Sequence, residues 1–159
     1  MEILAEAEQI TGPETLDLLR TAAVYHDCGF IRQYKANEPL AAEMASEYLR
    51  WFGYTVDQIA FVNRLILVTT LGAEPKDVYV QIIKDTDFDY LGQDGYWEIS
   101  LKLKEEWSHV GIVFDMPGWI ELQDRFLTGH RFSTNSALKL REPKKQEFLG
   151  MIKAGHYRK

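Results

Sequence analysis

The sequence predicts an all-α protein, and three observations carry that prediction. Apolar residues in every long segment recur at the three- and four-residue spacing of a helix face, and the connections between these segments are short. Apolar residues make up 46% of the chain and charged residues 26%, which is ordinary for a globular protein. A length of 159 residues suits a single domain that buries a substantial core. We therefore expect one helical domain spanning residues 1–159.

The N-terminal elements are predicted from periodicity and from breaks. Residues 2–9 form a short acidic helical stretch, and Thr11 is placed to cap the helix that follows. That helix is expected over residues 13–25, because Pro13 is tolerated in a first turn and apolar residues follow at helical spacing. Gly29 fits a helix stop, which leaves residues 31–36 as a connection.

The middle of the chain predicts three more helices, over residues 39–52, 55–71 and 76–91. The first buries a stripe formed by Ala41, Ala45, Tyr48, Leu49 and Phe52, and ends at Gly53. Thr55 fits the N-cap of the second, although β-branched residues at 68–70 make a strand there the weaker alternative. The third carries Asp87 on its apolar stripe, where a carboxylate needs an explanation.

The C-terminal part predicts a helix over residues 96–107, a turn at Pro117-Gly118, a helix over 119–127, and a basic helical segment over 134–154 interrupted near Pro143. The final residues are expected to fray. This part extends the core of the domain, which we place at residues 14–92, by a helical region at about 95–155.

Charge and cysteine content narrow the class of protein. The net charge of −6 argues against a nonspecific nucleic-acid binder, which concentrates basic residues to neutralise phosphates. A single cysteine, Cys28, cannot form an intramolecular disulfide, so a reducing cytoplasm is the simplest compartment. The sequence shows neither an apolar run of about 20 residues nor a signal sequence, so no membrane association is expected.

The most informative residues are the adjacent pair His26-Asp27. They follow an apolar helical run, where unpaired polar groups would cost several kcal/mol. Imidazole and carboxylate both bind divalent first-row cations, so the pair can serve one ion. The alternative is a core histidine that is paired with its neighbour or with the backbone.

Four segments carry a resemblance to a known family. They read LLRTAAVYHDCGF, YKANEPLAAEMASEYLRWFGY, LILVTT and IIKDTDFDYLG, and the match covers roughly residues 14–92. This pattern resembles the HD superfamily of metal-dependent phosphohydrolases, whose ligands are a His, then a His-Asp doublet, then a later Asp. The resemblance implies that His26, Asp27 and Asp87 bind a divalent metal ion (Mn, Mg, Fe, Co or Zn), with Asp85 and Asp89 as alternatives to Asp87.

Two positions depart from the family pattern. The residues before Leu16 contain no histidine, so the family's first ligand has no counterpart there. Asn37-Glu38 stands where many members carry His-Glu, which argues against the two-metal site of cyclic-dinucleotide hydrolases. With three ligands we expect weaker metal binding than in a complete site.

The resemblance implies hydrolysis of a small phosphorylated substrate, expected to be a nucleotide, by a phosphomonoesterase or a cyclic-nucleotide phosphodiesterase. A cation held by three ligands keeps positions for water and a phosphoryl oxygen. Asp27 and Glu38 are the catalytic candidates. Arg32 and Lys35, which follow the doublet, and Arg131, in a segment that resembles a subfamily found with nucleotide-cyclase modules, are the candidates for phosphate binding.

The missing histidine leaves three hypotheses. In an enzyme, water or another histidine (His109, His130 or His156) completes the coordination. In a regulatory module, the degenerate site binds nucleotide without turnover. In a truncated chain, the helix with the first ligand is lost or comes from another chain. In that case partly exposed tryptophans (Trp51, Trp97 and Trp119) would favour a homo-oligomer.

Overall fold

The computed structural model describes residues 1–70, 72, 74–75 and 77–156, and within them it contains helices, turns and bends but no strand. The prediction of an all-α fold is confirmed. The chain divides into two compact units, Met1–Asp87 and Phe88–Lys159, which we describe separately. That the two form a single domain remains a prediction. Among the described helices, none combines the length and the apolar content that crossing a bilayer requires.

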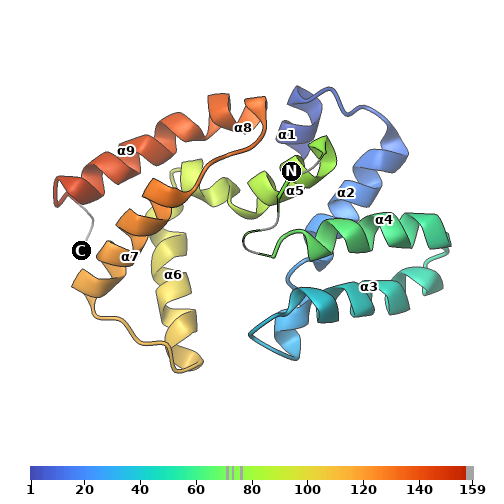
Figure 1. Ribbon diagram of the computed structural model, residues 1–159, viewed down its shortest axis with the longest axis horizontal. Helices are drawn as coiled ribbons and strands as arrows, with labels where there is room; N and C mark the ends of the chain where they lie inside the picture. Colours follow the sequence, from blue (N-terminus) through green and yellow to red (C-terminus); the bar gives the residue numbers. More distant parts are fainter. Residues whose placement is uncertain (71, 73, 76, 157–159) are drawn as a thin grey trace. The chain divides into compact units, whose positions relative to one another are not determined.

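The first unit contains five α-helices and one 3-10 helix in its described residues (Figure 1). They are α1 (Glu2–Ala7), α2 (Pro13–Tyr25), η1 (Cys28–Ile31), α3 (Glu38–Trp51), α4 (Val56–Leu67) and α5 (Val78–Asp87). The predicted helices therefore occur in the predicted order. The strand alternative at residues 68–70 is wrong, because these residues form a turn after α4. The predicted start of the next helix at Lys76 lies outside the described residues.

The core of this unit is built where α4 packs against α2 and α3. Helices α3 and α4 run side by side in opposite directions (Figure 1). Ala41 and Ala45, one turn apart on α3, are fully buried, and their small side chains let the two helices approach closely. Val62 and Ile66 on α4 are also fully buried, and each contributes about 1.5–3 kcal/mol of hydrophobic stabilisation.

Of three predictions about these helices, two need correction and one is confirmed. Thr11 does not cap α2, because the N-cap is Gly12, which provides no side chain. Tyr48 and Phe52 are 44% and 74% exposed, since the buried stripe of α3 consists of small residues and Leu49. Thr55 does cap α4: its hydroxyl accepts from the Gln58 N–H, while the Gln58 side chain accepts from the Thr55 N–H.

The second unit contains four α-helices and a 3-10 helix in its described part. They are η2 (Asp89–Gly92), α6 (Tyr96–His109), α7 (Met116–Gly129), α8 (Asn135–Leu140) and α9 (Glu142–Lys153). The predicted turn at Pro117-Gly118 is wrong. The Asp115 carboxylate accepts from the Gly118 N–H and caps α7, so Pro117 lies in the first turn of the helix, where its missing N–H costs nothing.

An aromatic core holds the second unit together. Tyr96 is fully buried and stacks on Phe148 with ring centroids 4.8 Å apart, and its hydroxyl donates to the Gln123 side chain at 2.8 Å. Trp119 is only 1% exposed, and its indole N–H donates to Ser100 Oγ at 3.0 Å. The expectation that Trp119 is partly exposed is therefore wrong, whereas Trp51 is 84% exposed.

Candidate metal site

The candidate ligands lie where two helices of the first unit end. His26 follows the last residue of α2, and its N–H donates to the Ala22 carbonyl at 3.0 Å, which continues the helical pattern by one residue. Asp27 comes next and precedes η1, while Asp87 is the last residue of α5. Because α2 packs against α5, the ends of the two helices bring the three side chains to one place.

The three side chains lie within contact distance of one another. His26 Nε2 is 3.3 Å from Asp27 Oδ2 and 3.4 Å from Asp87 Oδ1. One potential donor atom from each residue lies within 4.8 Å of the other two. The His26 side chain is 18% exposed, that of Asp87 25% and that of Asp27 57%, so the group is open to solvent on the Asp27 side.

This donor set fits a divalent cation. Two ligand atoms that each lie about 2.1 Å from one ion are roughly 3.0–3.4 Å apart in octahedral or tetrahedral geometry. The spacing from the imidazole nitrogen to the two carboxylates falls at that separation. An imidazole with two carboxylates suits Mn²⁺, Fe²⁺, Co²⁺ or Zn²⁺, and the hard carboxylate oxygens also suit Mg²⁺.

The backbone fixes which nitrogen of His26 faces the carboxylates. His26 Nδ1 lies 2.8 Å from the Ala23 carbonyl oxygen, which can only accept, so Nδ1 carries a proton. This leaves Nε2 as the ligand atom. A second hydrogen bond of this kind is typical of metal-binding histidines, because it sets the tautomer and the orientation of the ring.

Electrostatics in the metal-free site favour the imidazolium form. Burial would lower the pKa of His26, but the hydrogen bond with Asp87 and the charges of Asp27 and Asp87 outweigh burial. The pKa is raised to about 9. In the metal-free protein the proton on Nε2 therefore occupies the place that a cation would take.

This proton makes metal affinity depend on pH. A folded-state pKa above the ordinary value means that protonated His26 stabilises the metal-free fold below about pH 6.5, and that this contribution is lost as the pH rises through about 9.

Metal binding must displace the proton, so Mn²⁺ affinity should rise by about tenfold per pH unit between pH 6 and 8. Isothermal titration with Mn²⁺ at several pH values measures the slope, and His109→Gln should keep it. A pH-independent affinity would contradict the arrangement.

The structure distinguishes among the three neighbouring aspartates. Asp85 is 2% exposed and lies two residues before Asp87, which places it on a different face of α5. Asp89 belongs to the second unit, where the Arg141 guanidinium holds it through Nε–Oδ1 at 2.5 Å and Nη2–Oδ2 at 3.3 Å. Asp87 is thus the one that joins His26 and Asp27, although that these residues bind metal remains a prediction.

The remaining site candidates occupy different positions. Glu38 is the first residue of α3 and is half-buried, while Arg32 and Lys35 are exposed in the connection between η1 and α3. Arg131 lies in the second unit, where its guanidinium donates to the Thr128 and His130 carbonyls at 2.7 and 2.9 Å. The assignment of these four residues to catalysis or phosphate binding remains a prediction.

The three other histidines also belong to the second unit. The His130 ring packs against Phe132 at 4.6 Å, and its carbonyl accepts from the buried Lys145 ammonium at 2.8 Å. His109 ends α6, and His156 is exposed beyond α9. The proposal that one of them completes the metal coordination remains a prediction.

A close backbone approach beside the doublet was not foreseen. Gly29 is not a simple helix stop, because it lies buried inside η1. A Cβ built on Gly29 would lie 2.0 Å from the Asn37 carbonyl oxygen, so only glycine fits where η1 packs on α3. Asn37 is 6% exposed, and its side-chain oxygen accepts no hydrogen bond from the described residues. In the sequence, the signal for this close backbone approach was the glycine at position 29 itself.

Comparison with known proteins identifies the fold. The sequence profile named HD domain matches residues 1–88, which is more than half of the chain and includes His26, Asp27 and Asp87. The chain belongs to the HD domain family. HD domains typically bind divalent metal ions, and the family is in general one of metal-dependent phosphohydrolases. Searches of curated proteins and of solved structures gave no match. The matched residues include the adjacent pair His26-Asp27, and residues 1–25 contain no histidine.

Proposed function

We propose that this HD domain hydrolyses a phosphate ester of a nucleotide with the help of one divalent cation. Two activities fit, those of a phosphomonoesterase and of a cyclic-nucleotide phosphodiesterase. The observation that supports this most is the convergence of His26, Asp27 and Asp87 in a chain of this family. One imidazole and two carboxylates provide places for one cation, and Asn37 stands where a ligand to a second cation would be expected.

A bound divalent cation would supply Lewis-acid polarisation of a phosphoryl oxygen and would lower the pKa of a coordinated water. The chain's own residues contribute orientation and charge. His26 is held by its hydrogen bond to the Ala23 carbonyl, so its Nε2 keeps one direction without reorganisation. Asp27, the most exposed of the three, has a carboxylate oxygen within reach of solvent and can accept a proton from an attacking water.

Basic side chains are the candidates for phosphate recognition, and two of them follow the doublet closely in sequence. Arg32 and Lys35 follow Asp27 by five and eight residues, and both are exposed. Neither pairs with a carboxylate among the described residues, so both are available to a phosphate group. Arg131 is the third candidate, and Glu38 is the second acid or base at the start of α3. Within a cell we expect these residues to act in the cytoplasm.

A regulatory module is the second candidate function, and one observation favours it. In the described part of the chain, the group of donor atoms contains a single histidine, which is one fewer than the family motif provides. Such a site could bind a nucleotide and metal without turning over the substrate.

A metal-supplemented screen tests the proposal. Nucleoside mono-, di- and triphosphates and cyclic nucleotides are incubated with the protein and Mn²⁺, Mg²⁺, Co²⁺ or Zn²⁺, and products are separated by chromatography. We expect turnover that requires metal and falls by a factor on the order of 10³ in Asp27→Ala, because that change removes both a ligand and a proton acceptor. Glu43→Gln, an exposed charge change on α3, serves as the control.

The other outcomes are equally informative. Nucleotide binding without turnover would favour the regulatory module. Turnover that survives in Asp27→Ala would place the activity elsewhere, and neither turnover nor binding would refute both candidate functions.

A further inference from the structure

Helix α3 carries apolar residues on two faces. One face is buried in the first unit and includes Ala41, Ala45 and Leu49. A second stripe at helical spacing, which we call the outer face of α3, consists of Leu40, Met44, Tyr48 and Trp51. None of these four residues is buried, and Trp51 is 84% exposed. Because a surface helix normally presents apolar residues to one side only, the second stripe indicates a further contact.

The end of α2 extends this apolar surface. The Thr21 hydroxyl lies 3.0 Å from the Tyr54 hydroxyl, just beyond the end of α3, whereas Gly29 approaches Asn37 just before its start. Helix α2 therefore runs antiparallel beside α3, which lies at the edge of the first unit (Figure 1). Val24, one turn after Thr21, is 71% exposed and lies level with the second half of α3.

The exposed area is large enough for a specific interface. Roughly 500 Å² of side-chain surface is accessible on four residues, which are Val24, Tyr48, Trp51 and Phe52. The largest apolar patch on a typical monomer covers about 300–600 Å², so this surface is at the upper end of that range. A standard interface buries about 800 Å² on each partner, which the surface reaches when the polar side chains at its rim are included.

Two opposite charges accompany the outer face of α3. Glu47 and Arg50 are exposed and lie about one turn apart, and neither forms an ion pair with another described residue. The other charged residues of α3, Glu38 and Glu43, are acidic, so this helix is unsuited to an anionic membrane or a nucleic acid. A neighbouring glutamate and arginine instead match a second surface of the same kind.

We propose that the outer face of α3 is a dimer interface, on which a second copy of this chain packs its own α3 in the antiparallel direction. In a two-fold interface every contact occurs twice with the roles exchanged. An axis that crosses α3 midway between Glu47 and Arg50 places each glutamate beside the arginine of the other copy. It also buries both Trp51 side chains near the centre of the interface, where large aromatic residues contribute most to binding.

Sedimentation velocity of the full chain tests the interface. A chelator and a reducing agent are present, so that neither a metal ion nor Cys28 can link two copies. We expect a monomer–dimer equilibrium with a Kd on the order of 10 µM. Trp51→Lys should raise this Kd by a factor on the order of 100, because it removes the aromatic anchor. Val113→Lys changes a residue of the second unit that is 75% exposed and should leave the Kd unchanged.

A charge exchange tests the antiparallel arrangement. Glu47→Arg and Arg50→Glu each place like charges across the two-fold axis and should raise the Kd by about tenfold. The double variant Glu47→Arg/Arg50→Glu restores opposite charges and should return the Kd to within about threefold of the wild-type value. Glu106→Arg, at an exposed position of α6, is the control for a change of net charge.

Three results would overturn the proposal. They are a wild-type chain that stays monomeric up to about 200 µM, a Kd that does not change in Trp51→Lys, and a double variant as weak as the single ones. All substituted positions are exposed, so the substitutions leave the core of each unit intact. Because no nucleotide or metal is used, the outcome is independent of the proposed hydrolysis.

Discussion

Asp87→Asn should lower the affinity for Mn²⁺ by a factor on the order of 10²–10³. Among substitutions that keep the size of the side chain, this is the largest effect on metal binding that we expect. The substitution keeps the size of the side chain but removes one of the two negative charges that lie against His26 Nε2. It also removes the hydrogen bond and the charge that raise the pKa of His26, so a proton competes less with the metal ion, which offsets only part of the loss of a ligand. Loss of a ligand exceeds the 10–100-fold effect that is typical of outer-shell partners.

The measurement is isothermal titration with Mn²⁺ at one pH for wild type and variant. Asp57→Asn is a matched control, because it makes the same chemical change in the same unit at an exposed position away from the three ligands. The circular dichroism of Asp87→Asn should remain that of the wild type. If both variants bind Mn²⁺ as wild type does, Asp87 is not a ligand, and His26 with Asp27 alone must account for any binding.

Gly29→Ala should destabilise the fold by about 4 kcal/mol, the largest stability effect that we expect from a single added methyl group. The new Cβ would lie 2.0 Å from the oxygen and 2.8 Å from the carbon of the Asn37 carbonyl, and 3.1 Å from the Ala41 nitrogen. All three are backbone atoms, so no side chain can rotate to relieve the overlap. Either η1 or the start of α3 has to move.

Urea denaturation with a chelator present measures this effect without a contribution from metal. Gly150→Ala is the control, because Gly150 lies in α9 with nothing within 4 Å of a Cβ. Replacing a helical glycine by alanine in open space should stabilise by about 0.5–1 kcal/mol. The two glycine substitutions should therefore shift the urea midpoint in opposite directions. A midpoint for Gly29→Ala at or above the wild-type value would show that η1 does not pack as described.

Metal binding and the stability of the fold are linked at the His-Asp doublet. Asp27 is the residue immediately before η1, and Gly29 is the second residue inside it. The close approach of Gly29 to Asn37 therefore fixes where the chain leaves the doublet. The fold thus uses a glycine to hold a ligand-bearing segment against α3, and it uses the Ala23 carbonyl to orient the imidazole.

Local sequence determined the helices well. Helical periodicity with Pro13 at the start predicts α2 over residues 13–25, as observed. Gly53 follows the end of α3 with a φ of 79°, a backbone conformation that glycine adopts without strain. These signals act within a few residues of chain, so they are visible in the sequence. His26 and Asp27 are neighbours along the chain, so no folding is needed to bring them together. Short motifs also carried the resemblance to HD domains, and the match over residues 1–88 confirms that family.

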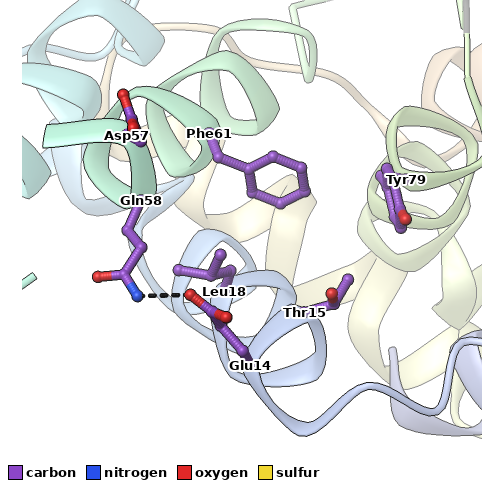
Figure 2. A pocket seen from close by; sticks show the side chains of 7 residues that line it. All are labelled: Glu14, Thr15, Leu18, Asp57, Gln58, Phe61 and Tyr79. Atoms are coloured by element: carbon purple, nitrogen blue, oxygen red, sulfur yellow. Dashed lines mark hydrogen bonds between the residues drawn. The ribbon is translucent and has the colours of Figure 1, made fainter. Parts of the chain in front are cut away.

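Tertiary structure decided what depends on the rotation and packing of whole helices. Asp85, Asp87 and Asp89 are equivalent as sequence, but two residues of helix rotate a side chain by about 200°. Only the packing of α5 on α2 determines which carboxylate reaches His26, and only the approach of η1 to α3 makes Gly29 irreplaceable. A pocket that is lined by residues of α2, α4 and α5, among them Glu14, Gln58 and Tyr79, depends in the same way on contacts between residues far apart in sequence, which no local pattern encodes (Figure 2).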